Sequence, residues 1–167
     1  MHLEEFNRQS PEKVRNDLFK CCGSNSWIDM LMEKFPFDSL DDLKISSDRI
    51  WFNCTKNDWL EAFSHHPKIG DTQGVAGKHN DTLEWARQEQ SAVKDARQII
   101  LDDLTKANKL YENKFGFIFI VCATGKSAEE MLNMLNERLK NEPEKELHIA
   151  VNEQNKITHL RIDKLFS

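Results

Sequence analysis

Two adjacent histidines precede a proline in the segment SHHPKIGD, residues 64–71. Proline disfavours the helical conformation in the residue before it, so Pro67 fixes the direction in which the His66 ring points. A histidine near a helix C-terminus also feels the negative end of the helix dipole, which favours its protonated form. Such an imidazole suits proton transfer near neutral pH, although taken alone a helix-terminal histidine is more often a structural cap. Because adjacent side chains diverge, we expect only His66 to face inward and His65 to face solvent.

A carboxylate and an amide project from the apolar face of a long helix further along the chain. Glu89 and Gln90 lie at spacings of three and four from the apolar residues of that face, so both are expected to point inward. A buried carboxylate needs a hydrogen-bonded or ionic neighbour. Periodicity alone leaves two interpretations open, a structural ion pair and a functional carboxylate. The apolar stripe itself consists of Ala86, Val93, Ala96, Ile100, Leu104, Ala107 and Tyr111.

Two other classes of function are compatible with these residues. His66, His79 and Glu89 are of types that bind metals, but no HxH or HExxH spacing joins them, so no metal site is expected. A small metal-dependent hydrolase using these three residues is one alternative function. A non-catalytic helical interaction domain, in which His66 and Glu89 are merely structural, is the other.

Composition and charge narrow the class of protein. The chain has 167 residues, of which 31% are charged and 39% hydrophobic, a balance typical of soluble globular proteins. Its net charge of −5 argues against a nucleic-acid partner, which would require a clustered basic face. No stretch approaches the roughly eighteen apolar residues that span a membrane. The four cysteines form no CxxC pair and no signal-peptide pattern is present, so we expect reduced, mostly buried thiols and a cytoplasmic location.

The elements that position these residues are nearly all helices. Capping patterns predict a helix from Ser10 to Gly23, where Gly23 is the expected C-terminal cap residue. A long loop is expected over residues 65–80, and residues 115–121 (FGFIFIV) are the one stretch that favours an extended chain. The remaining expected elements are a helix from Ser24 or Ser26 to before Phe35, a short turn of helix at residues 39–43, and helices from Thr55 through Phe63, from Asp81 to about Tyr111, from Ser127 through Leu139 and from Asn141 to about Leu165. The sequence thus predicts a single-domain, all-α helical bundle over residues 1–167, with one extended segment threaded through it.

These motifs resemble the family of 2-oxo-4-hydroxy-4-carboxy-5-ureidoimidazoline (OHCU) decarboxylases, which act in urate degradation. The resemblance covers nearly the whole chain in the family's order and spacing. The matching segments are Cys21 to Ser24 with Trp27, Pro36-Phe37, AFSHHPKIGD (62–71), WARQEQ (85–90), KFGFIFIVCATGKS (114–127), the helix end at 138–141, and KITHLRIDKL (156–165). The His-Pro motif followed by Glu-Gln is more specific than any single piece.

The resemblance implies an all-α homodimer that decarboxylates OHCU to S-allantoin without cofactor or metal. It assigns the catalytic roles to His66 and Glu89, without deciding which of them delivers the proton. It assigns substrate binding to Pro67 and Gln90, and to backbone groups of the extended segment. The segment's residues in this role are Phe119, Ile120, Val121, Cys122 and Ala123.

Two positions depart from the pattern of some relatives. Some members carry serine or threonine three residues before the glutamate, where this chain has Ala86. Some carry an arginine directly after the Cys-Ala of the extended segment, where this chain has Thr124, with Lys126 two residues later. We therefore expect Thr124 or Lys126 to anchor an anionic or carbonyl group of the substrate.

Overall fold

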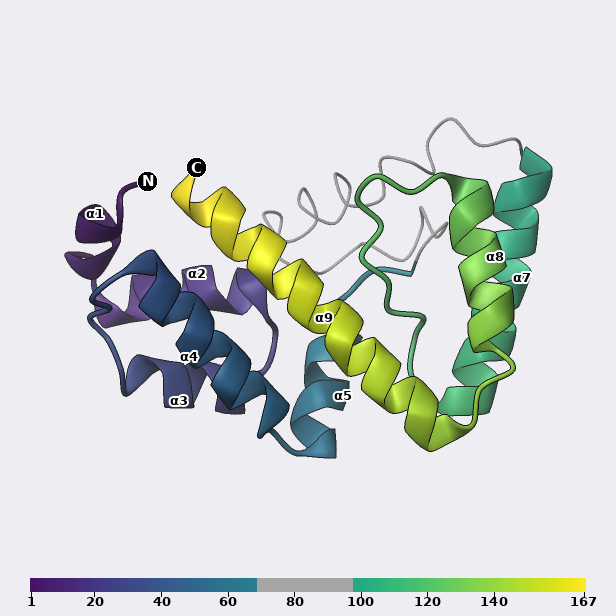
Figure 1. Ribbon diagram of the computed structural model, residues 1–167, viewed down its shortest axis with the longest axis horizontal. Coiled ribbons are helices and arrows are strands. Elements are labelled where there is room, and N and C mark those ends of the chain that lie inside the picture. Colours follow the sequence, from purple (N-terminus) through teal and green to yellow (C-terminus); the bar gives the residue numbers. More distant parts are fainter. Residues whose placement is uncertain (69–97) are drawn as a thin grey trace. The chain divides into compact units, whose positions relative to one another are not determined.

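The computed structural model describes residues 1–68 and 98–167, and every element assigned within them is a helix (Figure 1). This confirms the predicted all-α class. The chain divides into two compact units, Met1–Ala62 with Gln154–Ser167, and Phe63–Glu153. The prediction of one domain over residues 1–167 stays a prediction. The helices are α1 (Leu3–Asn7), α2 (Pro11–Cys21), α3 (Asn25–Met32), α4 (Leu40–Phe52), α5 (Lys56–Ser64), α7 (Gln98–Phe115), α8 (Ala128–Arg138) and α9 (Pro143–Phe166).

Helix starts in the first unit follow from local side-chain chemistry. The hydroxyls of Ser10, Ser24 and Ser39 each accept a hydrogen bond from the backbone N–H three residues later, which caps α2, α3 and α4. Thr55 and Asp58 exchange side-chain and backbone hydrogen bonds at the start of α5, as the predicted capping box requires. α2 ends at Cys21 with Cys22 as its C-cap, so Gly23 lies at the predicted position after the cap. It does not adopt the left-handed conformation typical of that position, since the described glycines with positive φ are Gly116 and Gly125.

The short turn of helix predicted at residues 39–43 is the beginning of a longer helix, because α4 continues to Phe52. Serine and aspartate in the middle of this helix are poor helix formers, so the sequence does not predict that the helix continues beyond its first turn. Tertiary packing outweighs that preference. Ser47 and Trp51 are almost fully buried, and the indole N–H of Trp27 donates to the Ser47 carbonyl at 3.2 Å.

In the second unit, α7 and α8 pack side by side (Figure 1). Leu104, Ala107 and Tyr111 are buried, which confirms this part of the predicted inward stripe, whereas Ile100 is only half-buried. The stripe's other members lie outside the described residues: Ala86, Val93 and Ala96.

α7 runs beyond its expected end near Tyr111 and stops at Phe115. The next residue, Gly116, has φ +80°, a left-handed conformation that glycine adopts without steric cost, and its N–H donates to the Glu112 carbonyl at 2.8 Å. The chain then continues without helix or strand from residue 117 to 123, so the predicted extended piece begins after Gly116 rather than at Phe115.

The described helices show no membrane-crossing character. α9 is long enough at 24 residues, but charges recur along its length. Across residues 1–68 and 98–167, no helix combines sufficient length with a sufficiently apolar composition to cross a bilayer.

Candidate active site

The His-Pro motif lies immediately after α5, which ends at Ser64. The His66 N–H donates to the Phe63 carbonyl at 3.2 Å, so the backbone at His66 is held by the last turn of the helix. Lys68 is tied to α7 through an ion pair with Glu112, with 2.6 Å between Nζ and Oε2. The motif is therefore held on both sides, which suits a residue whose ring must keep one direction.

Burial does not separate the two histidines. His65, His66 and Pro67 are all half-buried, so the expectation that His65 faces solvent is not confirmed. Both histidines take part in interactions within the structure. The choice of His66 over His65 as the catalytic residue therefore stays a prediction.

The other predicted catalytic group falls outside the described part of the chain. Glu89 and Gln90, like His79, lie within residues 69–97. Among the described residues, no three His, Cys, Asp or Glu side chains gather as metal ligands would. Because His79 and Glu89 are not among them, this observation does not test the metal-dependent alternative.

The extended segment is described throughout, and it is largely buried. Phe119, Ile120, Val121 and Ala123 are at most 6% exposed, whereas Cys122 is half-buried. Buried backbone N–H and C=O groups nearly always have hydrogen-bond partners. The partners of this segment therefore decide which of its groups remain for a ligand.

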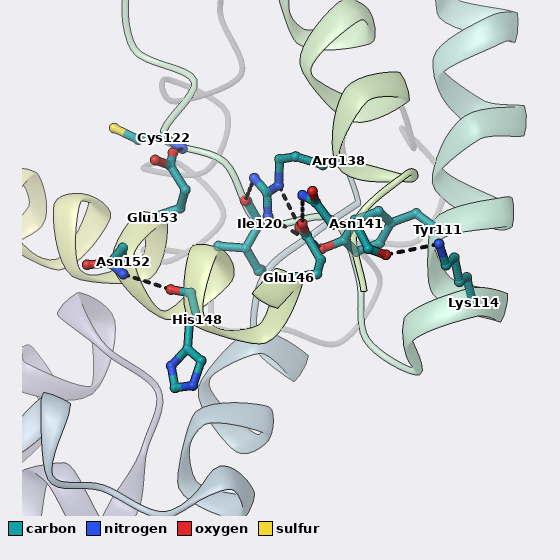
Figure 2. Close-up of polar contacts among 10 residues, drawn as sticks. All are labelled: Tyr111, Lys114, Ile120, Cys122, Arg138, Asn141, Glu146, His148, Asn152 and Glu153. Carbon is teal, nitrogen blue, oxygen red and sulfur yellow. Dashed lines mark hydrogen bonds and ion pairs between the residues drawn. The ribbon is translucent and has the colours of Figure 1, made fainter. Parts of the chain in front are cut away.

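Side chains of α8 and α9 hold two backbone groups of the segment (Figure 2). The Arg138 guanidinium donates from Nη1 to the Ile120 carbonyl at 2.6 Å. The Cys122 N–H donates to Oε2 of Glu153 at 2.7 Å. These are charge-assisted hydrogen bonds, which are roughly twice as strong as neutral ones.

The geometry of the peptide bond then orients Val121. In a trans peptide the C=O and N–H of one unit point in opposite directions, and the cis peptide among the described residues is Phe35-Pro36. The Val121 N–H therefore points away from Arg138, and the Val121 C=O points away from Glu153. No hydrogen bond to either group occurs among the described residues. Val121 thus presents one donor that points away from Arg138 and one acceptor that points away from Glu153.

A tight turn follows the segment and places the Lys126 ammonium group against it. The Lys126 N–H donates to the Ala123 carbonyl at 3.1 Å, and Gly125 within this turn has φ +76°, which strongly favours glycine. The Lys126 ammonium donates to the Cys122 carbonyl at 2.8 Å, whereas Thr124 is exposed. Of the two expected anchors, Lys126 is the one whose charge lies against the segment.

Sequence reasoning did not assign a role to Arg138, Glu146 or Glu153. Arg138 was part of the resemblance only as a helix-end motif. The two glutamates lie seven residues apart on one face of α9, but this spacing alone does not distinguish a buried face from a solvated one. Glu146 is 0% and Glu153 7% exposed, and acidic side chains are almost never so buried without partners.

The family model described as OHCU decarboxylase matches residues 7–163 of this chain. The chain belongs to the OHCU decarboxylase family. A solved crystal structure of OHCU decarboxylase in the presence of (S)-allantoin is 41% identical, with a TM-score of 0.76, and the match covers 90% of this chain and 97% of that one. A crystal structure of (S)-allantoin synthase, at 16% identity and a TM-score of 0.73, shares the fold; the match covers 98% of this chain and 54% of the other.

The family's curated members differ in length. The uric acid degradation bifunctional protein TTL of Arabidopsis thaliana is 42% identical over 148 residues, which cover 88% of this chain and 45% of that protein. The uric acid degradation bifunctional protein of Bacillus sp. (strain TB-90) is 25% identical, over 99% of this chain and 32% of its own length. The chain thus spans less than half the length of these relatives. In contrast, the OHCU decarboxylase of Halalkalicoccus jeotgali, 21% identical, is matched over 98% of this chain and 90% of its own length.

Proposed function

We propose that this chain decarboxylates OHCU to (S)-allantoin. The observation that carries the proposal is its 41% identity to an OHCU decarboxylase crystallised with (S)-allantoin, over 97% of that chain. The family match supports this function and supports neither the interaction domain nor the metal-dependent hydrolase. The position of His66 directly after α5, and the donor–acceptor pair of Val121, are consistent with a site for a small polar ring.

The substrate's own chemistry accounts for a reaction without a cofactor. OHCU carries its carboxylate on a carbon that also bears a hydroxyl and neighbours a C=N bond. When the bond to carbon dioxide breaks, its electron pair forms a C=C bond and the C=N electrons move to nitrogen, which takes a proton. The resulting enol becomes a ketone when the hydroxyl loses its proton and the neighbouring carbon gains one. The protein must therefore orient the carboxylate and place an acid on one face.

We assign the proton transfers to His66 and Glu89, with substrate contacts from Pro67 and Gln90. Of the backbone groups proposed for binding, the Ile120 carbonyl and the Cys122 N–H already have partners in α8 and α9. Val121 is the member of the segment whose N–H and C=O both point away from those partners. One donor and one acceptor on a single residue match the amide edge of a ureido group or of the oxo-imidazoline ring.

The proposal includes a homodimer in the cytoplasm. The dimer rests on the family resemblance of the sequence. The cytoplasmic location is supported by the cysteines, because all four are free and Cys21, Cys22 and Cys54 are buried. Burial raises the pKa of the Cys54 thiol to about 11, which keeps it protonated and unreactive at neutral pH.

Purified protein should consume freshly generated OHCU at an undiminished rate after exhaustive dialysis against a chelator. The reason is that the substrate provides its own electron sink, so no metal is required to stabilise the electron pair. The measurement is the loss of OHCU absorbance, with untreated protein as the control. A loss of activity that zinc or manganese restores would contradict the metal-free mechanism and favour the metal-dependent alternative.

Lys126→Ala is expected to raise the KM for OHCU about tenfold while changing kcat little, because a charge-assisted hydrogen bond contributes roughly 1.5–3 kcal/mol to binding. Steady-state kinetics measure both constants. Lys140→Ala removes an exposed lysine that pairs with Glu137 and is the matched control. An unchanged KM in Lys126→Ala would transfer the anchoring role to Thr124 or to backbone donors.

A further inference from the structure

Arg138 is the centre of a buried polar network in the second unit (Figure 2). It donates from Nη1 to the Ile120 carbonyl and from Nε to Oε1 of Glu146, each at 2.6 Å. Its side chain is 8% exposed and that of Glu146 is 0% exposed. The guanidinium also lies over the Phe119 ring, 4.6 Å from its centroid. One side chain thus contacts two consecutive residues of the extended segment.

Further side chains hold Glu146 itself. The Tyr111 hydroxyl donates to Oε1 and the Asn141 amide donates to Oε2 at 2.9 Å. Burial raises the pKa of the Tyr111 hydroxyl far above its ordinary value, so it stays protonated and remains a donor. Glu146 accepts from three different side chains, which leaves its carboxylate little freedom to rotate. The Nε–Oε1 contact therefore fixes the plane of the guanidinium.

A buried ion pair contributes little net stability to a protein core. Desolvation offsets much of its attraction, and well-packed apolar side chains of similar volume often stabilise a protein as well or better. An apolar replacement at position 138 would fill space but would supply no donor to the Ile120 carbonyl. The observed ion pair instead fixes the orientation of the Ile120 carbonyl, since the planar guanidinium of arginine bonds a carboxylate and a carbonyl simultaneously in fixed geometry.

We propose that Arg138, fixed by Glu146, is a positioning residue for the reaction. It acts through the Ile120 carbonyl, and the shared peptide plane sets the direction of the Val121 N–H toward the substrate. Arg138 itself does not touch the substrate. The inference rests on the proposed function, because the Val121 edge has a role only if this site binds OHCU.

Arg138→Lys tests the proposal in the full chain. Lysine keeps the charge but has one compact ammonium group, which cannot reproduce the two bonds of the fork in fixed geometry. We expect the KM for OHCU to rise about tenfold, with kcat within about twofold of wild type. We also expect faster hydrogen exchange at the Val121 amide in the presence of (S)-allantoin. Glu146→Gln should also raise KM and speed the exchange of the Val121 amide. It is the variant to measure if Arg138→Lys does not fold.

Leu104→Ala is the matched control, because Leu104 is fully buried in α7 of the same unit and makes no polar contact in this network. It should reduce the folded, active fraction, and so the apparent kcat, while leaving KM unchanged. The proposal is overturned if the Arg138 and Glu146 variants behave in the same way as this control, with unchanged KM and unchanged exchange at Val121. If the proposed function itself is wrong, the result differs, because wild-type protein would not consume OHCU. Hydrogen exchange at the Val121 amide without ligand would still report whether Arg138 orders the segment.

Discussion

Glu89→Gln is expected to lower turnover about 100-fold or more, because glutamine keeps the shape of the side chain but has neither the charge nor a transferable proton. This is the usual contribution of a general acid or base. The free energy of unfolding should hold or rise, since an inward carboxylate is costly to bury and functional sites tend to carry such costs. Steady-state kinetics and denaturant unfolding measure the two effects separately.

A structural role for Glu89 predicts the opposite pattern. Breaking a buried ion pair would lower stability by about 3–5 kcal/mol and leave turnover unchanged in the molecules that remain folded. The comparison therefore separates the two interpretations that periodicity left open. Unfolding at clearly lower denaturant concentration together with near-normal kcat would remove Glu89 from the catalytic assignment.

His66→Ala is the second substitution with a large expected effect, again a loss of about 100-fold or more in kcat. The fold should be unaffected, because the backbone N–H at position 66 donates to the last turn of α5 whichever side chain that position carries. His65→Ala is a closely matched control, since His65 is the adjacent residue and is also half-buried. We expect that control to retain most of the activity. Equal losses in the two variants would mean that the motif's catalytic histidine had been wrongly assigned.

The double variant tests whether His66 and Glu89 serve one step. When two residues serve the same step, removing either one removes most of their joint contribution to kcat. The double variant should therefore be little slower than the slower single variant. If the two losses multiply, His66 and Glu89 act in separate steps and the shared site is wrong. The comparison needs kcat for four proteins: the wild type, the two single variants and the double variant.

Much of the helical framework followed from local signals. Ser10, Ser24 and the Ser127–Glu130 capping box begin their helices as predicted, because a side-chain oxygen satisfies backbone donors within one turn. The full length of α4 did not follow, since its central serines disfavour helix and only long-range packing stabilises them there. Local preference and tertiary packing agreed in the first case and conflicted in the second.

The sequence predicted only those residues of the candidate site whose types and spacing by themselves indicate a function. His66 and Pro67 are conspicuous because their combination has a local effect on the backbone. Arg138 and Glu146 are ordinary charged residues in a helical sequence, and nothing local indicates that they are buried. Their role depends on a contact with Ile120, eighteen residues before Arg138, which periodicity does not encode.

The stereochemistry of the product tests the central claim most directly. OHCU, generated by oxidation of urate followed by hydrolysis of the oxidation product, is mixed with the full chain, and circular dichroism follows the formation of allantoin. We predict that the wild-type protein accelerates the loss of OHCU and yields (S)-allantoin in excess, because a placed acid protonates one face of the intermediate. Glu89→Gln and His66→Ala should return the rate toward the uncatalysed one. Formation of racemic allantoin at the rate seen without protein would contradict the assignment of this chain as an OHCU decarboxylase.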